Sequence, residues 1–137
     1  MPTTPPVPLL VASIGNPAPL YANTLHSAGH TLLEYIRSAR GWPAFQRERI
    51  MGNGLVSRKS YKRLDWKQGG YVDDADDPWT LWQSTSLMNA SGKGVKEAWE
   101  RWRRDAPEGQ GVLVVLHDEL EKPLGTVVVR KAGVSAR

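Results

Sequence analysis

The stretch GVLVVLH spans residues 111–117 and carries an unbroken aliphatic run from Val112 to Leu116. A short apolar run bounded by Gly111 and the polar His117 predicts a strand. Because no polar residues alternate with the aliphatic ones, the strand is of the kind that a parallel sheet buries on both faces. The run therefore predicts an α/β sheet with this strand near its centre.

Three further stretches have the composition of strands. Residues Val7–Ile14 are apolar and run into Gly15-Asn16-Pro17, which predicts a short buried strand that ends in a turn. The β-branched and aromatic content of Trp79–Ser84 predicts another strand, and Thr126–Arg130 is expected to form one more. Over residues 44–77 the pattern is poor, and we expect only short edge strands and a long polar loop.

Two helices are expected between these strands. Ser27 can cap the first, which Gly41-Trp42-Pro43 ends. Its apolar positions at helical spacing are Ala28, Leu32, Ile36 and Ala39. The second helix follows Ser91, its expected N-cap, and ends before Pro107. Three bulky side chains recur in it at i, i+4 and i+7 and are expected to pack on the sheet: Val95, Trp99 and Trp102.

Alternating strands and helices predict an α/β fold with a mainly parallel, mixed sheet flanked by helices. At 137 residues the chain fits one domain, residues 1–137, and the proline-rich residues 1–6 are expected to form a disordered tail. No apolar run is long enough to span a bilayer, and the first residues lack the cationic start of a secretory signal. We expect a cytoplasmic monomer, with the mitochondrion as the alternative compartment.

The charge of the chain is moderately basic. Lys and Arg number 18 against 14 Asp and Glu, a formal net charge of +4, which permits a nucleic-acid partner without requiring one. The basic residues gather in two groups, Arg47, Arg49, Arg58, Lys59, Lys62, Arg63 and Lys67, and then Lys93, Lys96, Arg101, Arg103 and Arg104. Each group alone is typical of a solvated surface, whereas the two together favour contacts with phosphate.

The chain has no cysteine, which excludes disulfides, thiolate metal sites and thiol nucleophiles. Catalysis must therefore use His, carboxylate, amide or hydroxyl groups. Such groups follow the expected strands, where the loops of an open α/β sheet converge. Asn16 follows the first strand, Asn89 follows the Trp79 strand, Asp118 follows the 111–117 strand, and His26 precedes the first helix.

Three motifs in this order resemble those of the bacterial-type peptidyl-tRNA hydrolases. Ile14-Gly15-Asn16-Pro17 with Tyr21 and His26 is similar to the opening signature of that family. The segment Ser86-Leu87-Met88-Asn89-Ala90-Ser91-Gly92-Lys93 resembles its Met-Asn-x-Ser-Gly motif. His117-Asp118-Glu119-Leu120, with Pro123 and Gly125, resembles its His-Asp-Glu-Leu stretch.

The resemblance implies hydrolysis of the ester that joins a peptide to tRNA, which recycles tRNA during translation. His26 is then the catalytic base and Asp118 the carboxylate that orients it, while Asn16 and Asn89 position substrate and water. Tyr21 and Met88 line the same cleft. The partner implied is peptidyl-tRNA, with no metal, no cofactor and no membrane.

Other interpretations stay open at this point. Asn16 is also a common turn former, Asn89 a possible helix cap, and His26 an ordinary residue at a helix start, as is His30. Trp42 and Trp66, in loop-like contexts, could stack on a base. A non-catalytic RNA-binding member of the same fold, similar to splicing factors, is the alternative function. A peptidase-like hydrolase is the least favoured function, because the sequence offers neither the metal ligands nor the nucleophile that such an enzyme needs.

The family resembled continues past the last motif found here. Its members carry a Gly-His-Asn-Gly segment that adds an Asn to the cleft, followed by a strand and helices. This chain ends at Arg137, so it is expected to lack the C-terminal third of such an enzyme.

Overall fold

The computed structural model describes residues 7–15, 27–59, 62–65, 67, 70–73, 79–87, 90–106, 110–118, 123 and 125–131. Only the backbone is described for β4 (Lys62–Asp65) and β5 (Gly70–Asp73), which pair with each other antiparallel. The main sheet consists of β1 (Leu9–Ser13), β2 (Gln46–Glu48), β3 (Gly54–Arg58), β6 (Trp79–Gln83) and β7 (Val112–Leu116). The helices are α1 (Ala28–Ala39) and α2 (Ser91–Asp105).

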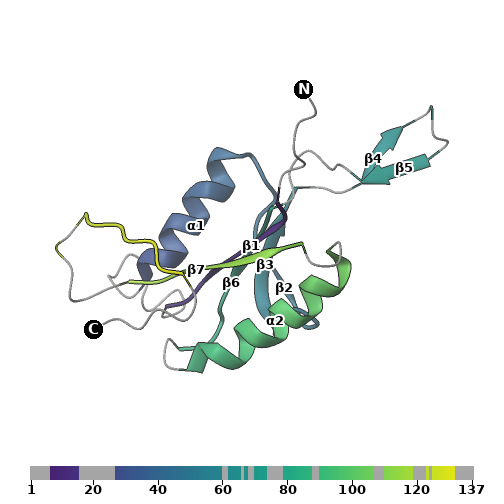
Figure 1. The fold of residues 1–137 in the computed structure, drawn as a ribbon. Coiled ribbons are helices and arrows are strands. Elements are labelled where there is room, and N and C mark those ends of the chain that lie inside the picture. The colour runs from purple at the N-terminus through teal and green to yellow at the C-terminus, as the bar shows by residue number, and fades with distance from the viewer. Residues whose placement is uncertain are drawn as a thin grey trace.

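The main sheet is mixed, in the order β2-β3-β6-β1-β7. Strand β1 runs parallel to both β6 and β7, with Leu10 opposite Thr80 on one side and Leu113 on the other. Strand β3 is antiparallel to both β2 and β6. Helices α1 and α2 cover opposite faces, and the β4–β5 ribbon projects away from the sheet (Figure 1). The expected α/β fold is therefore confirmed.

Alternation along the central strands divides the core into two clusters. The cluster under α2 contains Leu10, Ala12, Met51, Val56, Trp82, Ala98 and Trp102. The cluster under α1 contains Val11, Leu33, Trp42 and Leu81. Val95 and Trp99 pack against the α2 cluster, and Trp99 stacks on Trp102 with ring centroids 5.5 Å apart. The aromatic face expected of the second helix is therefore confirmed.

Three expectations about strands are wrong. Strand β3, in the stretch where only edge strands were expected, lies inside the main sheet between β2 and β6. Strand β7 lies at the edge of the sheet, paired only with β1 among the described strands, and none of its side chains is buried. Thr126–Arg130 forms no strand, because it has no strand partner among the described residues. An apolar sequence can indicate a buried strand, but only the available neighbours decide whether it is covered.

Details of the helices and of one tryptophan also differ from expectation. Of the expected apolar positions of α1, Ile36 packs against the core, whereas Leu32 is 47% exposed. The residues that α1 buries are Gly29 and Leu33, so the expectation was wrong for Ala28 and Leu32. The N-cap position of α2 is Ala90, one residue before Ser91. Trp42 is buried in the core and is not available to stack on a base, and the side chain of Trp66 lies outside the described residues.

Candidate active site

The carboxyl ends of three parallel strands lie side by side. Ser13 at the end of β1 is in register with Gln83 of β6 and Leu116 of β7. Hydrogen bonds continue one residue past the strands, because the Ile14 amide donates to the Leu116 carbonyl and the Ser84 amide donates to the Ser13 carbonyl, each at 3.0 Å. The chain segments that follow β1, β6 and β7 therefore start at the same end of the sheet, the carboxyl end of these strands, as the sequence predicted.

The first turn of α1 packs directly on the carboxyl ends of these strands. A Cβ atom at Gly29 would lie 2.6 Å from the carbonyl oxygen of Leu116 and 3.4 Å from that of Ile14. Only glycine allows the helix to come this close, since real Cβ atoms do not approach a carbonyl oxygen at 2.6 Å. Ser27, the N-cap of α1, is buried there with 3% of its surface exposed.

His30 joins the start of α1 to the end of β1. Its Nδ1 lies 2.6 Å from the hydroxyl oxygen of Ser13, which is fully buried. Burial lowers the pKa of His30, and this outweighs a backbone hydrogen bond with Gly15 that raises it. Burial therefore disfavours the protonated form of this ring, which lies beside Gly15 after the end of β1. Sequence reasoning treated His30 as an ordinary helix residue and had no signal for this contact.

Serine and threonine hydroxyls hold both ends of the loop between β6 and α2. The hydroxyl of Ser84 lies 3.3 Å from that of Ser91, which in turn donates to the Leu87 carbonyl at 3.2 Å. Thr85 donates to the carbonyl of Asn53, in the turn between β2 and β3, at 3.0 Å. These contacts position the described ends of the loop that carries the Met-Asn motif.

The expected site residues fall unevenly on the described structure. Asn16, Tyr21, His26, Met88 and Asn89 lie outside the described residues. Asp118 is described: it is half-buried and follows β7 by two residues, and its carbonyl lies 2.7 Å from Nδ1 of the exposed His117. Described residues close in sequence to Asn16, His26 and Asn89 lie near these strand ends: Gly15 bonds to His30, Ser27 precedes the Gly29 contact, and Ser91 shares a pocket with Ile14.

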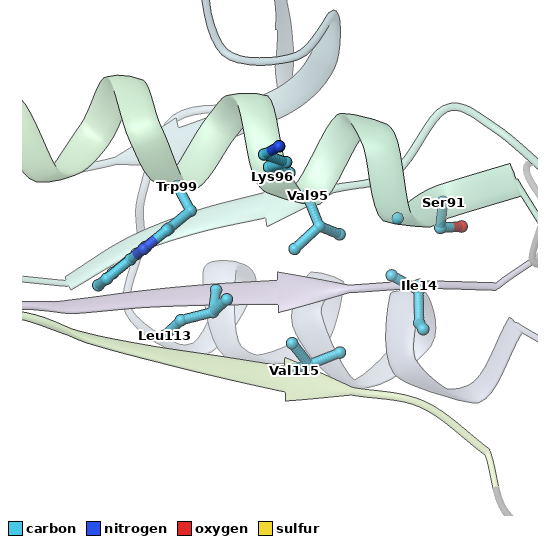
Figure 2. A pocket seen from close by; sticks show the side chains of 8 residues that line it. Ile14, Ser91, Val95, Lys96, Trp99, Leu113 and Val115 are labelled. Carbon is cyan, nitrogen blue, oxygen red and sulfur yellow. The ribbon is translucent and has the colours of Figure 1, made fainter. Parts of the chain in front are cut away.

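A pocket of about 430 Å³ lies between α2 and β7, next to the carboxyl ends of the strands (Figure 2). Its walls are mostly apolar: Val95 and Trp99 from α2, Leu113 and Val115 from β7, and Ile14. Ser91, Gly92 and Lys96 complete the lining. Within the described part of the chain, no three His, Asp or Glu side chains come close enough together to hold a metal ion, and no helix is long and apolar enough to cross a membrane.

Comparison with known proteins decides the family. The family described as peptidyl-tRNA hydrolase matches residues 10–137. The chain belongs to this family. All three motifs, from Ile14 to Gly125, lie inside the matched range. The peptidyl-tRNA hydrolase motifs that the sequence suggested are thus supported by a match over nearly the whole chain.

Peptidyl-tRNA hydrolases of several bacteria are similar to this chain. The protein of Methylocella silvestris is 32% identical over 128 residues, covering 93% of this chain and 55% of the relative. That of Treponema pallidum is 32% identical over 124 residues, covering 90% and 52%. That of Campylobacter concisus is 27% identical over 130 residues, covering 92% and 55%. The chain thus spans about half the length of these family members.

Proposed function

We propose that the chain forms the catalytic part of a peptidyl-tRNA hydrolase, which cleaves the ester between a peptide and tRNA. The observation that carries the proposal is the packing of Gly29 on the Leu116 carbonyl. This contact sets the start of α1, which begins two residues after His26, against the end of β7, two residues before Asp118. The base precedes the helix and the carboxylate follows the strand that meet at this contact, although the two residues are far apart in the sequence.

In this proposal His26 is the general base that activates water for attack on the ester carbonyl. Asp118 accepts a hydrogen bond from the other ring nitrogen, which selects the tautomer and stabilises the imidazolium that forms. An ester has a good leaving group, so activated water suffices and no covalent enzyme intermediate is needed.

Asn16 and Asn89 position the substrate and the attacking water, and an amide donor can stabilise the oxyanion that develops. Tyr21 and Met88 line the cleft around the peptide end. The loop that carries Met88 and Asn89 starts and ends at residues held by Ser84 and Ser91, which suits a site that needs fixed donors. The partner proposed is peptidyl-tRNA, bound by a monomer in the cytoplasm or, alternatively, in the mitochondrion.

The test is release of peptide from a blocked peptidyl-tRNA by the purified chain. His26→Ala should lower the rate by about 10²–10⁴, the range of general base catalysis. Asp118→Asn should also lower it, because the amide cannot stabilise the imidazolium. Asp105→Asn is the matched control: Asp105 is an exposed carboxylate at the end of α2, paired with Arg101 at 2.9 Å, and its loss should leave the rate unchanged.

Circular dichroism and tRNA binding separate the outcomes. A folded chain that binds tRNA without cleaving it would overturn the hydrolase proposal for this chain and favour the RNA-binding alternative. If cleavage persisted in His26→Ala, the assignment of the base would be wrong even though the activity stood.

A further inference from the structure

The turn between β2 and β3 packs against the first turn of α2. A Cβ atom at Gly52 would lie 2.3 Å from the carbonyl oxygen of Gly94, so the two backbones touch with no side chain between them. The next residue of the turn, Asn53, accepts a hydrogen bond on its carbonyl from the Thr85 hydroxyl at 3.0 Å. Thr85 belongs to the chain between β6 and α2. Two neighbouring residues of one turn therefore contact both the helix and the loop that leads into it.

The conformation of this turn is fixed by its own backbone. Gly52 and Asn53 both have positive φ, of 60° and 56°, and the Gly54 amide donates to the Met51 carbonyl at 3.2 Å. Positive φ at both central residues is typical of tight hairpin turns, whose twist matches that of the paired strands. Asn is among the few residues other than glycine that take this conformation readily. The Met51 carbonyl also accepts the indole N–H of Trp82, which holds the turn on the core. The Asn53 carbonyl is therefore an acceptor with a fixed position.

The loop between β6 and α2 is closed by hydrogen bonds on either side of the Met-Asn pair of the motif. The Ala90 amide donates to the Leu87 carbonyl at 2.9 Å, and this bond encloses residues 88–89. At the start of the loop, the Ser84 amide donates to a carbonyl of β1 at 3.0 Å. Thr85 follows at once and bonds to the turn between β2 and β3. The loop is therefore held on one side by the sheet and on the other by this turn.

We propose that Thr85 is a positioning residue for the hydrolysis, because its bond to Asn53 ties the loop that carries Met88 and Asn89 to a fixed turn. The inference rests on the function proposed above. Asn89 positions substrate and water in that function, and a donor stabilises developing charge best when its place is set before the reaction. Thr85 acts through the loop that it holds.

The test removes the hydroxyl and keeps the shape of the side chain. Peptide release from a blocked peptidyl-tRNA by the full 137-residue chain should show a kcat about twofold to tenfold lower in Thr85→Val, the factor that corresponds to one net hydrogen bond. Thr85→Ser keeps the donor and should keep kcat. The matched control is Thr80→Val, because Thr80 is buried toward the amino end of β6 and accepts the Trp102 indole N–H at 3.1 Å. It should lower the thermal midpoint more than Thr85→Val does and leave kcat unchanged at a temperature where every variant is folded.

Hydrogen exchange tests the same bond without catalysis. The Ala90 amide should exchange at least about threefold faster in Thr85→Val, because the loop opens more often, and at the original rate in Thr85→Ser and Thr80→Val. An active chain with an unchanged kcat in Thr85→Val would overturn the positioning role, as would an equal fall of kcat in Thr80→Val. A chain that releases no peptide would overturn the hydrolase proposal instead. Unchanged exchange at Ala90 would overturn the hold of Thr85 on the loop whether or not the chain is active.

Discussion

The imidazole Nδ1 of His30 lies 2.6 Å from the hydroxyl oxygen of Ser13, across the junction between α1 and β1. Ser13 is fully buried and His30 is half-buried, so the hydrogen bond is largely shielded from water. Together with the Gly29 contact on Leu116, it fixes the start of α1 on the strand ends. The candidate site is thus built on a helix start that is held by both a close backbone approach and a shielded side-chain bond.

The burial of His30 predicts a pH dependence of stability. The pKa of His30 is lowered in the folded chain from the ordinary value of 6.5. Between the folded-state pKa and 6.5 the unfolded chain therefore binds more protons, and the free energy of unfolding rises with pH. The contribution is complete above 6.5 and is lost as pH falls through the folded-state pKa. Urea unfolding at a series of pH values should show a shallower dependence in His30→Gln; parallel curves for the two proteins would contradict this.

Gly29 should not tolerate a side chain. In Gly29→Ala the new Cβ would meet the Leu116 carbonyl, and the helix must shift away from the strand ends. Overpacking of this kind costs about 1–3 kcal/mol of the free energy of unfolding, and the proposed hydrolysis should weaken as the helix start moves. The matched control is Gly92→Ala, where a Cβ in the first turn of α2 meets nothing within 4 Å. Denaturant unfolding should separate the two; equal stabilities would argue against the close contact.

Trp82 anchors the turn between β2 and β3. Its indole N–H donates to the Met51 carbonyl at 2.7 Å, and both residues are buried. Trp82→Phe removes this bond, while the Met51 carbonyl keeps the Gly54 amide as a donor at 3.2 Å. The lost bond costs about 0.5–1.5 kcal/mol of the free energy of unfolding before any cavity is counted. Trp79→Phe, in the other core cluster and only half-buried, should cost less. If the two variants unfolded at the same denaturant concentration, the Trp82 hydrogen bond would not be a distinct contribution to stability.

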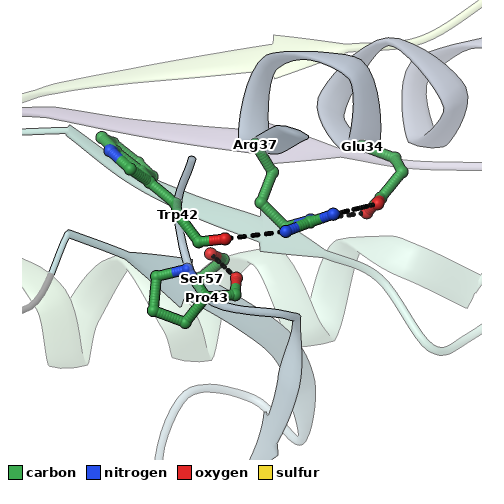
Figure 3. Close-up of polar contacts among 5 residues, drawn as sticks. All are labelled: Glu34, Arg37, Trp42, Pro43 and Ser57. Carbon is green, nitrogen blue, oxygen red and sulfur yellow. Dashed lines mark hydrogen bonds and ion pairs between the residues drawn. The ribbon is translucent and has the colours of Figure 1, made fainter. Parts of the chain in front are cut away.

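Arg37 ties the end of α1 to the chain that follows it (Figure 3). Its guanidinium donates to the Trp42 carbonyl at 2.7 Å and to the Glu34 carboxylate at 2.6 Å and 3.0 Å. The pKa of Arg37 is raised, chiefly by the hydrogen bonds to Glu34. Exposed ion pairs add little stability, whereas the bond to the Trp42 carbonyl holds the segment that carries a buried tryptophan. Arg37→Gln should therefore lower the thermal midpoint more than Glu34→Gln; the reverse order would make the ion pair the main contribution.

The sequence pattern was sufficient to predict those features that depend only on residues close together in the chain. The aromatic face of α2 could be predicted because helical spacing alone puts Val95, Trp99 and Trp102 on one side. The strand at Trp79–Gln83 could be predicted from its β-branched and aromatic content. Which leucine of α1 is buried could not be predicted, because Leu32 and Leu33 are equally apolar. With Gly29 packed on the strand ends, Leu33 is the one that lies in the core.

The family and the proposed catalytic residues could be predicted from short sequence motifs, because a motif depends only on which residues follow one another in the chain. The contact between His30 and Ser13 joins residues 17 positions apart, and no local pattern pairs them. The position of β7 shows the same limit most clearly. Its aliphatic run determined that it would be a strand, since that preference lies in the side chains themselves. Whether it is central or at an edge was decided only by the tertiary structure, because coverage depends on which other segments are present to pack against it.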